Sequence, residues 1–126
     1  MNENSLYTYK AAIVRIIDGD SCVLKINLGF RVVIELPCRL AHIDTPELRS
    51  PDDAARARAM EAKQKLTELL ADPEVIIRSF KPFHGDKFGR YLVEIINSKG
   101  INVNQTLLDL GLATLYEGGK KNQPNT

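Results

Sequence analysis

The chain has 126 residues, a length that fits one domain with one hydrophobic core and excludes two ordinary domains. Its composition, 44% hydrophobic and 26% charged residues, is typical of a globular protein, and no apolar run approaches the ~20 residues that span a bilayer, so we expect no membrane insertion. The formal net charge of +1 excludes a strongly basic domain, so any phosphate binding must come from the local placement of charges.

The first third of the chain is rich in β-branched and aliphatic residues and predicts a three-stranded meander. Turn-forming residues interrupt the apolar stretches at positions 18–20 and 27–29. The predicted strands are Ala11–Ile17, Cys22–Ile26 and Arg31–Leu40.

A helix is predicted to follow, with Ser50 as its capping residue, Pro51 at its first position and Asp53 three residues after the cap. Its apolar residues recur at spacings of three and four, which predicts one face packed on the sheet. These residues are Ala55, Ala59, Ala62, Leu66 and Leu69.

Two further strands are predicted at Glu74–Phe80 and Tyr91–Ile96, and a second helix at about Val103 to Leu110. Gly111 can adopt the left-handed conformation that ends a helix. We therefore expect an N-terminal arm at residues 1–9, one domain at residues 10–117 and a flexible tail at residues 118–126.

The element order of three strands, a helix, two strands and a helix predicts an α+β fold that is mainly β. It matches a five-stranded Greek-key barrel of the OB type with two or three helices packed on it. Many α+β domains share this order, so the fold alone names no reaction.

The N-terminal segment is polar and has no apolar stretch followed by a small-residue cleavage site, so a cytoplasmic location is expected. The two cysteines, Cys22 and Cys38, match neither a zinc-ligand spacing nor a dense disulfide framework. We expect buried thiols, although a bridge between neighbouring strands is also compatible with the sequence.

Polar residues gather in three places where predicted strands end, at positions 18–21, 39–47 and 86–90. Each cluster has an ordinary explanation when it is taken alone. The first fits a hairpin turn, the second an exposed arginine followed by a helix-approach loop, and the third a solvated charged loop.

Together, these clusters contain the groups that phosphodiester hydrolysis requires. Asp20 and Asp44 can supply carboxylates to a hard divalent cation, and Glu47 can activate or position a water molecule. Arg39 and Arg90 can bind phosphate oxygens and neutralise the charge that develops on phosphorus during attack.

The stretches at 17–21, 39–47 and 86–90 resemble, in order and spacing, the signature of the staphylococcal nuclease (thermonuclease) family. A fourth stretch at 103–113 resembles the family's second helix and its exit, so the resemblance covers roughly residues 10 to 117. It implies an OB-type barrel with a calcium ion held by Asp20, Asp44 and the main-chain carbonyl of Thr45. Glu47 would be the proposed general base, and Arg39 and Arg90 the phosphate-binding arginines.

The resemblance also implies cleavage of DNA and RNA with little sequence preference, by attack of water on phosphorus, leaving 3′-phosphate ends. Lys87, Phe88 and Tyr116 lie at or near positions where family members contact substrate. Phe88 stands where the best-known member has Tyr, so a phenol contact to phosphate is lost. A buried core tyrosine explains Tyr116 about as well as a base-stacking platform does.

The alternative function is a nucleic-acid or protein binding module, because relatives exist in which the barrel survives and the acids and arginines are replaced. All five charged residues of the pattern are present here, which favours catalysis. The sequence leaves the oligomeric state open.

Overall fold

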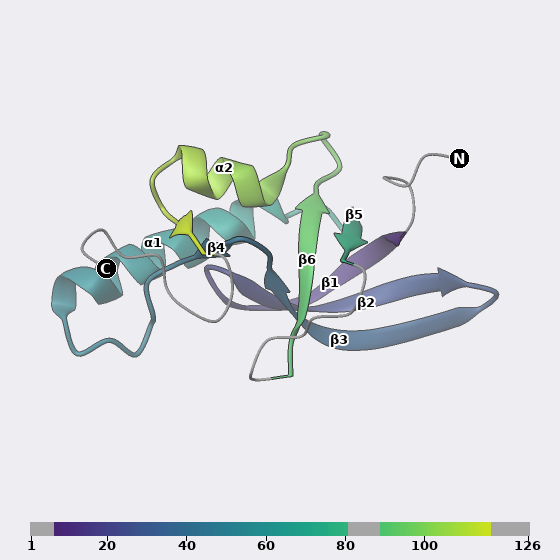
Figure 1. Ribbon diagram of the computed structural model, residues 1–126, viewed down its shortest axis with the longest axis horizontal. Coiled ribbons are helices and arrows are strands. Elements are labelled where there is room, and N and C mark those ends of the chain that lie inside the picture. The colour runs from purple at the N-terminus through teal and green to yellow at the C-terminus, as the bar shows by residue number, and fades with distance from the viewer. Residues whose placement is uncertain (1–6, 81–88, 117–126) are drawn as a thin grey trace.

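The computed structural model describes residues 7–80 and 89–116 (Figure 1). The elements are β1 (Thr8–Asp18), β2 (Ser21–Gly29), β3 (Val32–Leu40), β4 (Ile43–Asp44), α1 (Asp53–Leu69), β5 (Glu74–Ser79), β6 (Tyr91–Ile96), α2 (Val103–Asp109) and β7 (Thr114–Leu115).

Five strands form a closed barrel in the order β1-β2-β3-β6-β5. All pairings are antiparallel except that of β3 with β6, which is parallel and spans only Cys38 to Leu40 on β3. The two helices lie on one side of this barrel (Figure 1). The predicted mainly β fold, a five-stranded OB-type barrel with helices packed on it, is confirmed.

A second, two-stranded sheet was not predicted. In it, β4 pairs with β7, with Ile43 opposite Leu115 and Asp44 opposite Thr114. Each strand is two residues long, too short to show any alternation of apolar and polar residues.

The barrel interior is filled by aliphatic side chains from every barrel strand, closed on one side by α1 and α2. On α1 the buried residues are Ala59, Ala62 and Leu66, which confirms the predicted apolar face. No helix in the described part of the chain is long and apolar enough to cross a membrane.

The predicted start of the first helix is wrong by two residues. Asp52 is the N-cap, and its carboxylate accepts hydrogen bonds from the main-chain N–H groups of Ala54 and Ala55 at 3.4 and 3.2 Å. Ser50 instead accepts a hydrogen bond from the N–H of Asp52 at 3.2 Å, in the turn before the helix. A serine and an aspartate two residues apart can both cap a helix, and here the aspartate does so.

The second helix ends as predicted, with Gly111 in the left-handed conformation at φ 74°. The turn between β2 and β3 lies later than predicted. Phe30 and Arg31 have φ values of 55° and 66°, the two consecutive left-handed residues of a tight hairpin turn, and β3 begins at Val32 rather than at Arg31.

The N-terminal boundary of the barrel also differs from the prediction. β1 begins at Thr8, and Thr8 to Ala12 pair with β5, so the end of the predicted arm belongs to the sheet. The predicted tail at residues 118–126 and the predicted substrate contacts Lys87 and Phe88 lie outside the described residues.

Candidate active site

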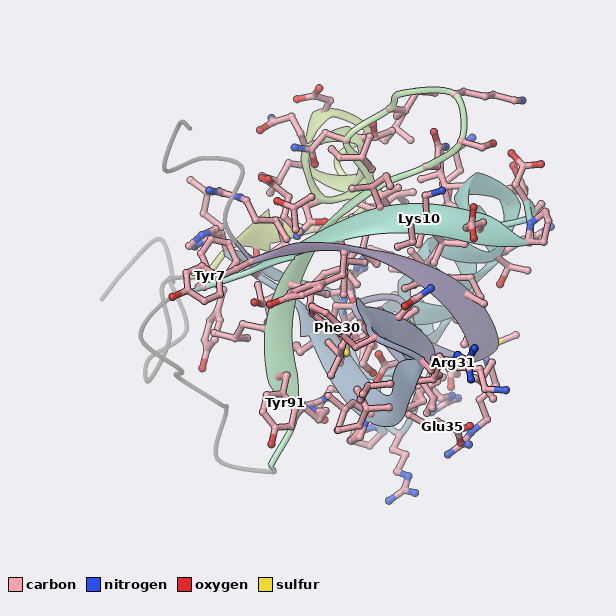
Figure 2. The ribbon with its side chains drawn as sticks, turned by 90° about the vertical axis from the view of Figure 1, so that its right-hand side faces the viewer. Tyr7, Lys10, Phe30, Arg31, Glu35 and Tyr91 are labelled. Atoms are coloured by element: carbon pink, nitrogen blue, oxygen red, sulfur yellow. The ribbon has the colours of Figure 1, made fainter. Side chains whose placement is uncertain are left out.

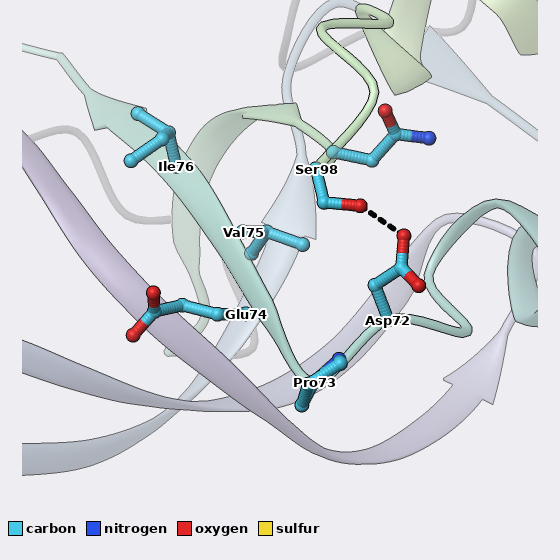
Figure 3. A pocket seen from close by; sticks show the side chains of 7 residues that line it. Asp72, Pro73, Glu74, Val75, Ile76 and Ser98 are labelled. Carbon is cyan, nitrogen blue, oxygen red and sulfur yellow. Dashed lines mark hydrogen bonds between the residues drawn. The ribbon is translucent and has the colours of Figure 1, made fainter.

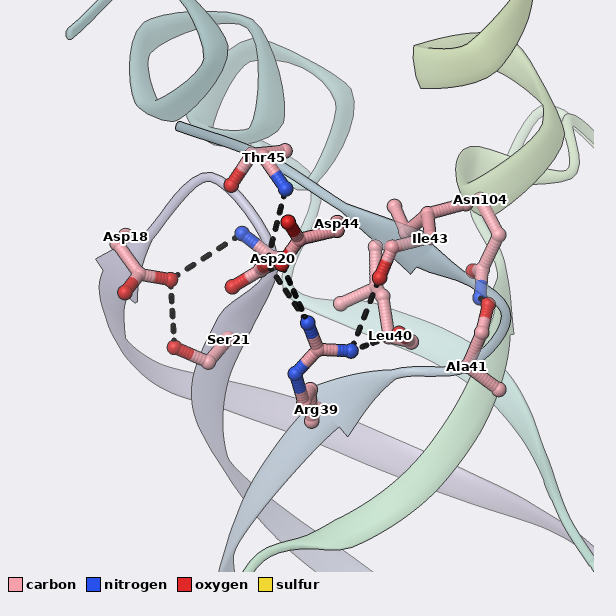
Figure 4. Close-up of polar contacts among 10 residues, drawn as sticks. All are labelled: Asp18, Asp20, Ser21, Arg39, Leu40, Ala41, Ile43, Asp44, Thr45 and Asn104. Atoms are coloured by element: carbon pink, nitrogen blue, oxygen red, sulfur yellow. Dashed lines mark hydrogen bonds and ion pairs between the residues drawn. The ribbon is translucent and has the colours of Figure 1, made fainter. Parts of the chain in front are cut away.

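Two carboxylates meet on one arginine at the centre of the candidate site (Figure 4). Nη2 of Arg39 donates to Oδ2 of Asp20 at 3.3 Å and to Oδ1 of Asp44 at 2.9 Å. Nη1 of the same guanidinium donates to the carbonyl of Ile43 at 2.9 Å. Arg39 therefore joins the two acids that the sequence predicted as metal ligands.

Strand register explains why these residues meet. Ser21 on β2 lies opposite Arg39 on β3, so Asp20, in the turn just before β2, lies beside Arg39. The N–H of Leu40 also donates to the carbonyl of Asp20 at 2.8 Å, which extends the β2–β3 ladder into the turn. Asp44 follows on β4 and returns toward the same guanidinium.

The cluster is shielded from water. Asp20 and Arg39 are each only 6% exposed, and the side chain of Asp44 is 18% exposed. Ionised groups in such an environment are stable only with charged and hydrogen-bonding partners. The alternative that Arg39 lies on the outer face of the barrel is therefore excluded.

The neighbouring acid Asp18 shapes the electrostatics of the cluster. Its Oδ1 accepts hydrogen bonds from the N–H of Asp20 at 3.2 Å and from Oγ of Ser21 at 2.6 Å. Burial, together with the carboxyl of Asp18, raises the pKa of Asp20 well above its ordinary value. Burial also acts to raise the pKa of Asp18, but hydrogen bonds from Asp20 and Ser21 and the charge of Arg90 hold it below its ordinary value.

Asp18 had no role in the sequence prediction beyond that of a turn residue. The signal was present, because a second acid two residues before Asp20, with Ser21 directly after it, is the spacing of a side chain that caps its own turn. The structure adds that this carboxyl lies beside the predicted metal ligand, where it helps to raise the pKa of Asp20.

The turn is held against helix α1 through Gly19. A Cβ atom at this position would lie 2.7 Å from Cβ of Ala62 and 2.9 Å from Oγ1 of Thr45. The N–H of Thr45 donates to Oδ2 of Asp20 at 3.1 Å. Only glycine fits this contact, which fixes Asp20 relative to both α1 and the segment after β4.

The donor atoms fit a hard divalent cation. The carboxylates of Asp20 and Asp44 converge on one guanidinium, that of Arg39, and the carboxyl of Asp18 lies beside Asp20. Across residues 7–80 and 89–116, no three His, Cys, Asp or Glu side chains are grouped closely enough to hold a metal by side chains alone. A cation here would need main-chain and water oxygens as well, which calcium accepts.

The remaining predicted residues surround this cluster to different degrees. Tyr116 is partly exposed, and its ring centroid lies 4.8 Å from Cζ of Arg39, a cation–π contact. Arg90 is partly buried directly before β6, near enough to act on Asp18. Glu47 is exposed on the segment between β4 and α1, and its role in activating water stays a prediction.

Asn104 on α2 was missed as a supporting residue. Its amide donates to the carbonyls of Ala41 and Val93 at 3.1 and 3.0 Å, and its side-chain oxygen accepts from the N–H of Ile95 at 3.1 Å. These bonds tie α2 to β6 and to the segment that leads from Arg39 to Asp44. Nothing in the local sequence marks an asparagine in a helix for this role.

A separate shallow pocket lies where β5 begins (Figure 3). Its rim includes Asp72, Pro73 and Ser98, with the Ser98 hydroxyl donating a hydrogen bond to Asp72. None of the predicted site residues lines it, so the candidate site is the Asp20–Arg39–Asp44 cluster and not this pocket.

The fold and the site define a small OB-type barrel with a buried carboxylate–arginine cluster. Residues 37–126 match the family described as Staphylococcal nuclease homologue, and the chain belongs to this family. Two curated proteins, from Escherichia coli O157:H7 and Escherichia coli, each named "Uncharacterized endonuclease", are 30% identical to it over 105 residues. The match covers 83% of this chain and 60% of each relative, so the chain spans less than two thirds of their length.

Proposed function

We propose that this chain is a calcium-dependent nuclease that hydrolyses phosphodiester bonds in DNA and RNA with little sequence preference and leaves 3′-phosphate ends. The observation that carries the proposal is the buried convergence of Asp20 and Asp44 on Arg39. The family membership and the endonuclease name of the relatives support it.

The buried acids have a physical explanation in this function. Removing one partner of a buried ion pair costs several kcal/mol, because the other charge is left without compensation. An intact buried pair nevertheless adds little stability compared with apolar packing. A site that binds a cation and a phosphate uses these charges, whereas a purely structural core gains little from them. Perturbed pKa values such as those of Asp18 and Asp20 are common at such functional sites.

Asp20, Asp44 and the main-chain carbonyl of Thr45 would hold the calcium ion. When bound, the ion would supply Lewis-acid stabilisation of a phosphoryl oxygen. Asp18 would orient the turn that carries Asp20, through its hydrogen bonds to Ser21 and to the N–H of Asp20.

Arg39 would neutralise the negative charge that builds up on the phosphoryl oxygens. Its guanidinium is held in place before substrate arrives by the Ile43 carbonyl and the two acids, which limits the reorganisation needed during the reaction. Arg90 would supply the second positive charge on the phosphate. Glu47, exposed to solvent, would accept the proton from the attacking water.

The test is a cleavage assay with labelled single- and double-stranded DNA and RNA, in calcium, in magnesium and in a chelator. We expect cleavage with calcium and no cleavage with the chelator. The products should carry a 3′ phosphate that a 3′-phosphatase removes, which lowers their negative charge. Binding without cleavage in calcium would contradict the proposal and favour the binding-module alternative.

Two variants assign the roles of individual residues. Glu47→Gln and Arg90→Lys should each slow cleavage by about 10²-fold or more, because each removes a group that acts in the transition state. Arg58→Lys, at an exposed position on α1, is the matched control and should cleave at the normal rate. Unchanged rates in the first two variants would show that the assignment of roles is wrong.

A further inference from the structure

The segment that carries Glu47 is anchored at both of its ends. At its start, the buried residue Thr45 donates its N–H to Oδ2 of Asp20 at 3.1 Å. At its end, Nη1 of Arg56 on α1 donates to the carbonyl of Ser50 at 2.8 Å. Glu47 therefore lies between two fixed points, two residues after the first and three residues before the second.

A turn between the two anchors connects Arg56 to Glu47. The N–H of Ser50 donates to the carbonyl of Glu47 at 3.2 Å, which closes a four-residue turn. Ser50 thus accepts a hydrogen bond from Arg56 at its carbonyl and donates one to Glu47 from its N–H. The guanidinium on the helix and the acid on the loop are linked through a single residue.

Helix α1 gives this anchor a fixed support. Ala62 on α1 is fully buried, and it packs against Gly19 so closely that a Cβ atom on the glycine would lie 2.7 Å from its own Cβ. Gly19 belongs to the turn that carries Asp20. The anchor therefore ties Glu47 to the same helix that positions a predicted metal ligand.

The stability of α1 does not explain the placement of Arg56. It is the fourth residue of the helix, and a cation in the first turn is unfavourable near the positive end of the helix dipole. Its ion pair with Asp53 is exposed, with 43% and 92% of the two side chains accessible, and exposed pairs add little stability. The bond to the Ser50 carbonyl is partly buried, where water weakens a charge-assisted hydrogen bond less.

We propose that Arg56 is a positioning residue that holds Glu47 in place for the reaction. This inference rests on the proposed function, in which Glu47 accepts the proton of the attacking water. Glu47 is exposed, so the position of its main chain decides where its carboxylate can reach. A displacement of about 1 Å can slow such a reaction about 10²-fold. Arg31, labelled in Figure 2 at the tip of the β2–β3 hairpin, lies at the end of the molecule opposite this segment in Figure 1 and cannot replace Arg56.

The first test compares the cleavage kinetics of Arg56→Gln, Arg56→Lys and the control Arg58→Gln. Arg56→Gln should lower kcat about ten-fold or more and change KM by about two-fold at most, because the group that it displaces acts in the transition state. Arg56→Lys, whose ammonium can still donate to the Ser50 carbonyl, should recover most of the rate. Arg58→Gln removes the same charge from an exposed position on the same helix and should cleave normally. A higher KM with unchanged kcat would indicate direct phosphate binding and overturn the positioning role.

A double variant tests whether Arg56 acts through Glu47. Adding Arg56→Gln to Glu47→Gln should slow cleavage no further, because the group that Arg56 positions is already missing. A further loss of about ten-fold in the double variant would show that Arg56 acts independently of Glu47, which would overturn the inference.

The second readout is the mobility of the segment, which does not depend on activity. Nitrogen-15 relaxation of the parent protein should give the amides of Glu47–Ser50 order parameters of about 0.85, as in a rigid backbone. In Arg56→Gln these values should fall to about 0.6 or below, and in Arg58→Gln they should match the parent. Equal order parameters in all three proteins would overturn the anchor. A parent protein that does not cleave would contradict the proposed function, and the order parameters would then decide the anchor alone.

Discussion

Asp20 and Asp44 bind the same nitrogen atom, Nη2 of Arg39, at 3.3 and 2.9 Å. The two acids come from different turns of the chain, one before β2 and one on β4. A single guanidinium therefore sets the distance between the two predicted metal ligands.

Arg39→Lys should lower the free energy of unfolding in a chelator by about 2–4 kcal/mol, although the charge is kept. One ammonium group cannot reproduce the fork that serves two carboxylates and the Ile43 carbonyl. Urea unfolding measures the effect, with Arg58→Lys at an exposed position as the control. Equal stability of the two variants would show that the bridge contributes nothing.

Gly19→Ala should destabilise the protein by about 1–3 kcal/mol, because the added methyl group would overlap Ala62 and Thr45. Ala62→Gly alone should cost about 1 kcal/mol as a glycine within a helix. The double variant should lose less than the two single losses combined, because the second change makes room for the first. A double-mutant cycle in urea measures this coupling, and strict additivity would refute the contact.

Asn104→Ala should lower the free energy of unfolding by about 2–4 kcal/mol, since it leaves the carbonyls of Ala41 and Val93 and the N–H of Ile95 without their partner. Asn104→Asp should cost more at neutral pH, because an ionised carboxylate would face two carbonyl oxygens. Gln105→Ala is the matched control at an exposed position of α2. An aspartate variant more stable than the alanine variant would contradict this assignment.

Cys22 and Cys38 lie directly opposite each other on β2 and β3, both fully buried as free thiols. Burial raises the pKa of each thiol to about 12, so almost no thiolate is present at pH 8 in the folded protein. We expect no reaction with a thiol reagent at pH 8 until urea is added, whereas the thiol of a Val14→Cys variant, at an exposed position on β1, should react at once. Rapid labelling of the folded parent protein would contradict the buried placement.

The raised pKa of the two thiols makes the free energy of unfolding depend on pH above about pH 9. The unfolded chain loses these protons near pH 9, and the folded chain only near pH 12. The folded state therefore binds more protons across this window, and the free energy of unfolding falls as the pH rises from about 9 to about 12. Replacing both cysteines with alanine should flatten that part of the stability curve.

Sequence reasoning reached the elements whose signals are local. Apolar stretches and turn residues placed the barrel strands, and the spacing of Ala59, Ala62 and Leu66 gave the buried face of α1. Arg39, Asp20 and Asp44 could be singled out because charged residues stood where apolar strands end. The structure confirms that these three residues meet.

Contacts between distant segments were beyond the reach of such patterns. The close approach of Gly19 to Ala62, the three hydrogen bonds of Asn104 and the β4–β7 pair all depend on how the elements pack. A local pattern can also select the wrong residue, as it did when Ser50 rather than Asp52 was predicted to cap α1.

The pairing of β4 with β7 has a consequence for the order in which the site is completed during synthesis. The strand that pairs with Asp44 is translated after α1, both later barrel strands and α2, and the N–H of Tyr116 reaches back to the carbonyl of His42 at 2.8 Å. A nascent chain that already contains Asp20, Arg39 and Asp44 lacks the partner that holds β4 in place. We therefore expect a nascent chain to hold Asp44 against Arg39 only after residue 116 has been added.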